Sequence, residues 1–300
     1  MRSVPAAHAA LLAANLIYGA NYSIAKEVMP SVIQPFGFIL MRVGTAALVF
    51  WLIGWLSGNL RLVEKKDIPG IILCAFFGVA LNQSLFFYGL SITSPINASI
   101  MMVCTPLLVL MLAIWMRKES GGGWKVVGVL LGLAGALTLL LFKGKATFSN
   151  ATRLGDAAVL INALSWGMYL VMVKPYMEKY GAMNIIRYVF LFGFILVIPL
   201  GAAQLATVDL ASLTTAIWLK IGFVVFGTTV IGYYLNTMAL QWSGPTLVSA
   251  YIYLQPFLAS FFAWITLHEL PGLLQITAAM LIFAGVYLSG YRKKESPEAD

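Results

Sequence analysis

Charged residues are scarce in this chain: Asp, Glu, Lys and Arg make up 10% of its 300 residues, whereas 61% are hydrophobic. The mean hydropathy is +0.90. A soluble domain of this length could not cover so much apolar surface, because its exterior would be as hydrophobic as its core. The composition therefore excludes an ordinary soluble protein and indicates a bilayer, where each spanning helix needs about 20 apolar residues and satisfies its own backbone hydrogen bonds.

Cysteine and histidine are also scarce, with two of each. Cys74 and Cys104 lie in apolar segments, where they are best interpreted as small hydrophobic side chains, and no spacing fits a metal site. Because no nucleophile–base pair or metal set is present, we predict neither enzyme activity nor a cofactor. The net charge of +8 comes from basic residues in expected loops and the tail, so membrane topology explains it better than nucleic-acid binding.

Acidic residues are missing from the middle of every expected span. This counts against the simplest proton antiport, in which a buried acid binds a proton and a cation in turn. It also disfavours small permanent cations as substrates, although the aromatic content of 13% leaves an aromatic cage open. A neutral, zwitterionic or anionic organic solute is favoured.

Two stretches of the chain repeat each other at a constant offset of 150 residues. The matched positions are Pro95 and Pro245, Pro106 and Pro256, Glu119 and Glu269, and Gly135 and Gly285. Such a spacing, held over about forty residues, indicates a duplicated chain. We expect a first repeat over 1–143, a connecting loop over 144–153, a second repeat over 154–291 and a charged tail over 292–300.

Ten apolar segments can be separated at polar, Gly or Pro breaks, and they predict an all-α polytopic membrane protein. The expected spans are 7–28, 35–56, 69–90, 95–116, 124–142, 154–173, 183–204, 216–240, 246–267 and 271–291. With both termini in the cytoplasm, twelve basic residues fall in cytoplasmic segments and five on the other side. Since each repeat has an odd number of spans, the second must be inverted, an architecture typical of transporters. We expect an inner-membrane protein.

The pattern resembles that of the EamA-type drug/metabolite transporters over nearly the whole chain. The matching residues are Pro106, Glu119 and Gly135 in the first half and Pro256, Glu269 and Gly285 in the second. The run Asn15-x-x-Tyr18-Gly19-x-Asn21-Tyr22 is also similar to the first helix of that family. The resemblance implies a central cavity shared by the two halves and alternating access. It leaves open whether the substrate is an amino acid, another metabolite, a drug or a sugar derivative.

Polar side chains form stripes at helical spacing along several expected spans. Asn15, Tyr18 and Tyr22 share one face of the first, which should turn away from lipid because polar groups are costly there. The alternative use of such stripes is interhelical hydrogen bonding, worth about 0.6 kcal/mol per contact. The candidate substrate-binding residues are Asn15, Tyr18, Tyr22, Asn82, Gln83, Asn97, Trp166, Tyr169, Tyr233, Asn236, Ser249 and Tyr253.

A second set of residues suggests gating. Its members are Arg42, Pro106, Glu119, Arg187, Pro256 and Glu269. Inversion symmetry predicts one ionic latch on each face, Arg42 with Glu269 and Arg187 with Glu119. The arginines could instead capture a substrate carboxylate or phosphate, or snorkel to the headgroups. Each proline is expected to bend its helix mid-span, as a gating element or as a static kink.

Two lysines and three glycines also have expected roles. Lys26 and Lys174 are expected to snorkel to the interface. Gly128, Gly132 and Gly135 lie on one side of their helix and favour packing within the chain over dimerisation, so a monomer is preferred.

We therefore expect a transporter of small organic metabolites, amino acid-like and zwitterionic or anionic, that works by alternating access and exports its substrate. A lipid flippase or scramblase, and a passive channel-like facilitator, are the alternatives on the same fold. The expected partners are a small-molecule substrate and membrane lipid, with no nucleic acid.

Overall fold

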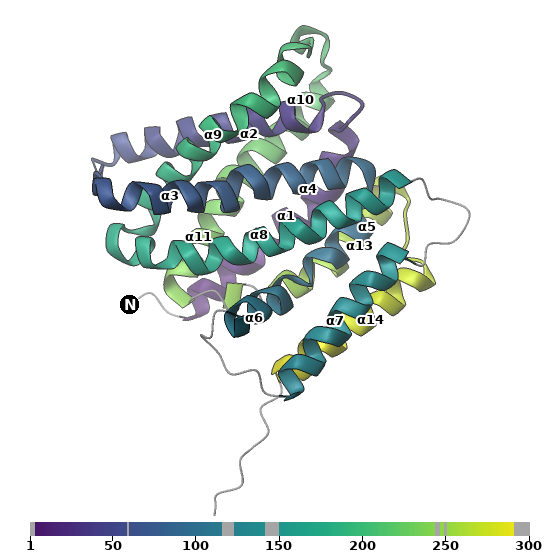
Figure 1. Cartoon of the computed structure of the whole chain (residues 1–300). Coiled ribbons are helices and arrows are strands. Elements are labelled where there is room, and N and C mark those ends of the chain that lie inside the picture. Colours follow the sequence, from purple (N-terminus) through teal and green to yellow (C-terminus); the bar gives the residue numbers. More distant parts are fainter. Residues whose placement is uncertain are drawn as a thin grey trace, which may run out of the picture.

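The computed structural model describes residues 4–58, 60–115, 123–141, 150–243, 247–248 and 251–290. Within these ranges the chain forms helices and the turns that join them (Figure 1). Six helical stretches there are long and apolar enough to cross a membrane, and three shorter apolar helices accompany them. The expected all-α polytopic class is confirmed, whereas the count of ten spans stays a prediction. Most of the expected connecting loop and the tail over 292–300 lie outside the described residues.

The first half of the chain contains seven α-helices among its described residues. They are α1 (Val4–Val28), α2 (Pro35–Leu56), α3 (Ile68–Ala75), α4 (Leu81–Ile92), α5 (Pro95–Met102), α6 (Thr105–Trp115) and α7 (Gly123–Leu141). A 3₁₀ turn (Lys65–Asp67) leads into α3, and a π-helical segment (Phe76–Ala80) joins α3 to α4 without a break.

The second half follows the same plan. Its α-helices are α8 (Asn150–Tyr180), α9 (Ala182–Ala206), α10 (Thr215–Gly222), α11 (Tyr233–Ser243), α13 (Gln255–Leu267) and α14 (Leu273–Gly290). A π-helical segment (Phe223–Gly232) again joins the third span's two parts, and 3₁₀ turns lie at Leu210–Ser212 and Tyr251–Leu254. A π-helical segment therefore occurs at the equivalent place in both halves, and such segments are frequent near functional sites.

The two matched prolines do not lie inside continuous helices, contrary to the expectation. Pro106 is the second residue of α6 and Pro256 the second residue of α13, and each helix begins after a break. The first turn is where proline is tolerated, because its missing N–H would have no partner there. At the first break, Thr105 Oγ1 donates to the carbonyl of Met102, 2.7 Å away, which Pro106 leaves without a backbone donor. A gating role for these breaks remains a prediction.

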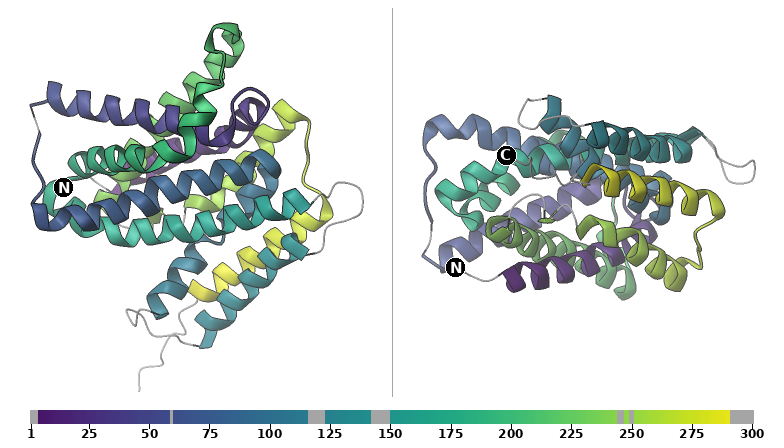
Figure 2. Two further views of the ribbon diagram at one scale, coloured as in Figure 1. Left: turned by 45° about the horizontal axis from the view of Figure 1, so that its top comes forward. Right: turned by 90° about the horizontal axis from the view of Figure 1, so that it is seen from below.

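Helix pairing is matched between the halves (Figures 1 and 2). The second spans, α2 and α9, pack on each other, and so do the last spans, α7 and α14. The pair α4 and α8 has its counterpart in α11 and α1, and α6 with α8 has its counterpart in α13 with α1. This reciprocal pattern agrees with a duplicated chain whose halves interlock.

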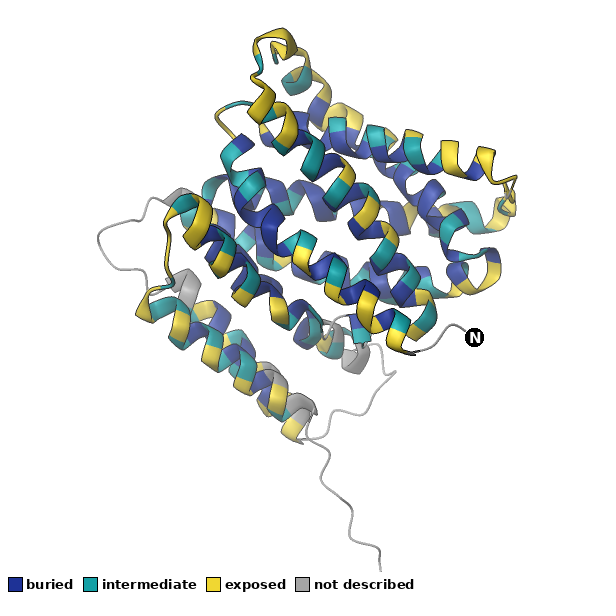
Figure 3. Ribbon diagram, turned by 180° about the vertical axis from the view of Figure 1, so that it is seen from behind, coloured by how far each residue is buried: buried dark blue, intermediate teal, exposed yellow. Residues whose placement is uncertain are grey.

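Large apolar side chains lie on the outside of the molecule, and polar and charged side chains are buried within its mainly apolar interior. Figure 3 shows exposed residues along the outer faces of the helices. Leu48 is 74% exposed and Tyr287 72%, whereas Arg42 and Arg187 are the two largest fully buried side chains, at 1% each. Such an arrangement suits a bilayer, where lipid covers the outer apolar side chains and polar groups turn to the bundle interior.

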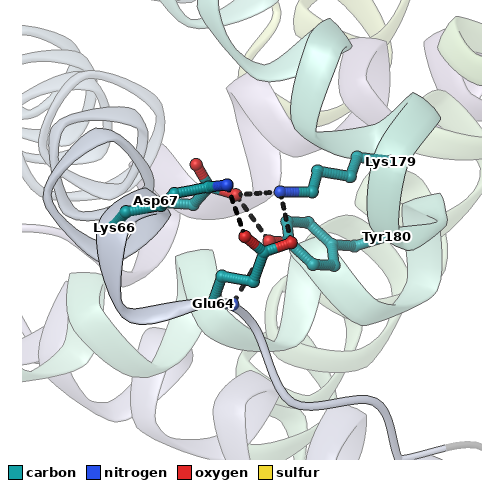
Figure 4. A network of polar contacts seen from close by, with 5 residues as sticks. All are labelled: Glu64, Lys66, Asp67, Lys179 and Tyr180. Carbon is teal, nitrogen blue, oxygen red and sulfur yellow. Dashed lines mark hydrogen bonds and ion pairs between the residues drawn. The ribbon is translucent and has the colours of Figure 1, made fainter.

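Ion pairs fix one end of two equivalent helix pairs. Figure 4 shows Lys179, near the end of α8, 2.7 Å from Asp67 and 2.6 Å from Glu64, both just before α3. Hydrogen bonds from Lys179 and then Lys66 hold the pKa of Glu64 below its ordinary value. At the other end of the molecule Lys220 of α10 pairs with Glu27 of α1, so the signs are exchanged between the halves.

The inverted orientation of the halves predicts a labelling result. A cysteine at Arg61, before α3, and one at Ala216, at the start of α10, should face opposite compartments, and both sites are exposed. In intact cells an impermeant maleimide should label Ala216→Cys and spare Arg61→Cys. The unaltered chain is the control, since Cys74 and Cys104 are buried. Equal labelling of both sites without permeabilisation would contradict the inversion.

Candidate functional site

A cavity lies among the helices of both halves, with about 680 Å³ of empty volume, part of it open to solvent. Its walls come from α1, α2, α4, α5, α8, α11 and α13, and from the π-helical segment after α10. The lining residues are Asn15, Tyr18, Asn21, Tyr22, Arg42, Asn82, Gln83, Phe86, Phe87, Met102, Asn162, Trp166, Thr228, Tyr233, Asn236, Val248, Ile252 and Gln255.

Eight of the predicted substrate-binding residues meet at this cavity. They are Asn15, Tyr18, Tyr22, Asn82, Gln83, Trp166, Tyr233 and Asn236. The polar stripe on α1 therefore faces inward, as its helical spacing predicted. Whether these residues bind a substrate remains a prediction.

Three predicted residues lie elsewhere, and Ser249 falls outside the described residues. Asn97 donates to Asp156 at 3.5 Å and accepts from Gln275 at 3.3 Å, so it belongs to a polar cluster at the end of the bundle. Tyr169 packs behind Trp166, with 5.1 Å between ring centroids, in space that a side chain at Gly78 would fill.

Tyr253 does not line the cavity. Its ring packs against Phe283 of α14, with 6.0 Å between centroids. The residue belongs to the 3₁₀ turn before α13, whose altered twist changes the side-chain directions that a continuous α-helix would give.

Several lining residues were missed by the sequence analysis as binding candidates. The polar ones are Asn21, Thr228 and Gln255, whereas Arg42 was predicted as a gating residue with substrate capture as its alternative role. Asn21 lies three residues after Tyr18, a helical spacing that could have indicated it. Gln255 is recognised only through the fold, because its contacts are with α1, more than 200 positions earlier.

A hydrogen-bonded chain joins α1 to α13 along one wall. Tyr22 OH donates to Gln255 Oε1 at 2.6 Å, and Gln255 Nε2 donates to Asn15 Oδ1 at 3.2 Å. Asn15 in turn donates to the carbonyl of Leu11, one turn earlier. These bonds span the two halves, so the wall on this side is a shared surface.

On the opposite wall, two asparagines bridge α4 and α8. Asn162 Nδ2 donates to the backbone carbonyl of Asn82 at 2.6 Å, and Asn82 Nδ2 donates to that of Asn162 at 3.4 Å. Gln83 Nε2 donates to Tyr233 OH of α11 at 3.1 Å. The side-chain oxygens Gln83 Oε1 and Asn162 Oδ1 are buried without a partner, so they are free to accept.

Arg42 does not form the predicted latch with Glu269. Its Nε and Nη2 donate to Thr229 Oγ1 at 2.9 and 2.7 Å, and its guanidinium lies 3.9 Å from the ring centroid of Phe87. Glu269 lies instead near Lys26: burial raises the pKa of Glu269, and the charge of Lys26 opposes that rise. Since α2 carries Arg42 into the cavity, the side chain is a lining residue and not an end-of-helix cation.

Arg187, the counterpart of Arg42 in α9, lies outside the cavity. It donates to Asn184 and lies 5.8 Å from the ring centroid of Trp51, beside Gly54. Its predicted partner Glu119 falls outside the described residues, so that latch stays a prediction.

A polar cluster closes the bundle at the α4–α5 junction. Lys26 Nζ donates to the carbonyls of Leu90, Ser91 and Thr93 at 2.9, 2.8 and 2.8 Å, which corrects the expectation that it snorkels to lipid. The reason is the end of α4, whose last carbonyls have no helical donor and attract a cation. Asp156 of α8, fully buried, accepts from the hydroxyl of Thr93.

In the described part of the repeat-related end, this contact has no counterpart. Lys174 occupies the equivalent position in α8, at an offset of 148 from Lys26. Among the described residues it has no hydrogen-bond or ion-pair partner. The two ends of the bundle therefore differ, although the sequence repeats.

Comparison with known proteins gives a consistent result. The model of the EamA-like transporter family matches this chain twice, at residues 6–141 and 153–291. An uncharacterized transporter of Archaeoglobus fulgidus is 29% identical over 88% of this chain and 89% of its own length. The Arabidopsis thaliana protein WALLS ARE THIN 1 is 28% identical over 78% and 70%. A solved crystal structure shares the fold with a TM-score of 0.65 at 19% identity, covering 96% of this chain and 98% of that one.

Proposed function

The chain belongs to the EamA-like transporter family and is an integral membrane protein, and we propose that it carries small organic solutes across the membrane by alternating access at the cavity described above. The expected substrate is amino acid-like, either zwitterionic or anionic. The direction proposed is export from the cytoplasm across the inner membrane, with both termini cytoplasmic.

One observation carries this proposal: the polar side chains of both halves converge on one cavity. The tyrosine, asparagine and glutamine groups of α1, α4, α8, α11 and α13 would cost free energy in lipid, and here they line one cavity. Binding sites at the interface of two repeats are typical of secondary transporters. Residues 1–143 and 154–291 are proposed as the two repeats that move relative to each other.

The difference between the two ends supports alternating access. Lys26 ties α1 to the end of α4, while its counterpart Lys174 makes no such bond to the described residues. We interpret this as a bundle closed at the Lys26 end. In the second state the bonds of Lys26 would break and the Lys174 end would close.

The test is counterflow in proteoliposomes. Purified protein should exchange a labelled panel of neutral amino acids and monocarboxylates, and unlabelled substrate on the far side should accelerate uptake. Tyr233→Ala should abolish most of this flux, because Tyr233 contacts Tyr18, Trp166 and Gln83 across the cavity.

The outcomes separate the proposal from its alternatives. Flux that unlabelled solute does not accelerate would favour a channel-like facilitator. Redistribution of labelled lipid without solute exchange would favour a flippase or scramblase. Either result would contradict the solute carrier proposed here.

A further inference from the structure

We infer that Arg42 is the binding site for a substrate carboxylate, and that the cavity is built for an organic anion with a net charge of −1; this rests on the proposed function. The inference starts from the environment of this one side chain. Arg42 is 1% exposed, and its Nη1 is buried without a hydrogen-bond partner. Its other donors reach only Thr229, a neutral hydroxyl.

No anion compensates this charge within the described residues. An arginine cannot lose its proton in a protein, and a buried cation without a counter-charge is costly. The described cavity lining holds no Asp or Glu, and no described carboxylate pairs with Arg42. A cavity lined by a buried guanidinium without a compensating carboxylate is electrostatically suited to bind an anionic ligand.

The groups that line the cavity with Arg42 indicate that the anionic group of the ligand is a carboxylate. The hydroxyl of Tyr18 is also buried without a partner, and both Tyr18 and Arg42 line this cavity. One carboxylate has two oxygens, which can accept from Arg42 Nη1 and from Tyr18 OH together. The face of Phe87 holds the guanidinium plane at 3.9 Å, so the donor is oriented before the ligand arrives.

Charge counting separates the possible ligands. Arg42 is the one charged side chain in the described lining, so a monoanion neutralises the cavity. A phosphate monoester, which carries up to two negative charges at neutral pH, would leave an excess anion among aromatic walls. A zwitterion would leave the excess cation in place. Gln83 Oε1 and Asn162 Oδ1 remain for neutral N–H or O–H donors on the ligand body.

The experiment measures binding to the full chain in lipid nanodiscs. The probes share one aromatic scaffold and differ in charge: 3-phenylpropionate, phenylalanine, 3-phenylpropanamide, phenethylamine and phenyl phosphate. We expect 3-phenylpropionate to bind most tightly, and Arg42→Gln to weaken it about 10- to 100-fold while leaving the amide nearly unchanged. Arg187→Gln, which changes a buried arginine outside the cavity, should retain the charge preference.

Thermal unfolding without ligand gives an independent readout. Removing an uncompensated buried charge should leave the Tm of Arg42→Gln equal to or above that of the wild type. A lower Tm would assign Arg42 a structural role and overturn the inference, as would tighter binding of phenylalanine or phenyl phosphate. Selective carboxylate binding without counterflow in proteoliposomes would contradict the transport proposal but would support the anion-binding site.

Discussion

Replacing Lys26 with methionine is expected to open the closed end of the bundle. The ammonium group satisfies three carbonyls at the end of α4, from Leu90, Ser91 and Thr93. A hydrogen bond to a charged group contributes about 1.5–3 kcal/mol, so the loss of even one of these bonds is about a 10- to 150-fold change in an equilibrium. Methionine keeps the length of the side chain and removes all of these donors.

The measurement is the maleimide labelling rate of a cysteine introduced at Ile96, which is 2% exposed just beyond the α4–α5 junction. We expect Lys26→Met to raise this rate about 10-fold or more, because the opened junction exposes the thiol. Lys174→Met is the matched control: it removes the equivalent lysine, which has no partner among the described residues, and should leave the rate unchanged. Equal rates in the two variants would show that Lys26 does not hold this end closed.

Local periodicity explains what the sequence predicted well. The side chains of Asn15, Tyr18 and Tyr22 recur at three and four positions, so one regular helix places them together whatever surrounds it. All three line the cavity. Such a prediction needs only the helix and the fact that lipid rejects polar groups.

Partners distant in the sequence explain what was predicted poorly. Arg42 was assigned to Glu269 by symmetry, yet its acceptor is Thr229, which the π-helical segment after α10 turns toward α2. Lys26 was expected at the lipid interface, because its contacts at the end of α4 depend on how α1 packs beside it. Neither the π-segment nor that packing produces a periodic pattern of residues in the sequence.

The repeated glycines illustrate an intermediate case. Their spacing predicted close packing but not the partner, which is the equivalent helix of the other half. A Cβ built on Gly285 would lie 2.5 Å from both the carbonyl oxygen of Gly128 and the amide nitrogen of Gly132. The two helix backbones are in direct contact there. In Figure 1, α7 and α14 lie side by side at the edge of the bundle.

Gly285→Ala is therefore expected to destabilise the protein strongly for so small a change. Neither obstructing atom belongs to a flexible side chain, so the helices must separate, at a cost of about 1–3 kcal/mol. Close packing of small residues is a main source of helix association in lipid, where the hydrophobic effect does not drive one helix onto another. The Tm of the purified protein in detergent should fall accordingly.

Gly222→Ala is the control that gives this result its meaning. Gly222 ends α10, and no atom lies within 4 Å of a Cβ added there, so alanine should stabilise the helix by about 0.5–1 kcal/mol. The same substitution thus has opposite signs at two helical glycines, because one faces a backbone and the other faces open space. If Gly285→Ala instead raised the Tm as Gly222→Ala should, α7 and α14 could not approach each other as closely as Gly128, Gly132 and Gly285 allow.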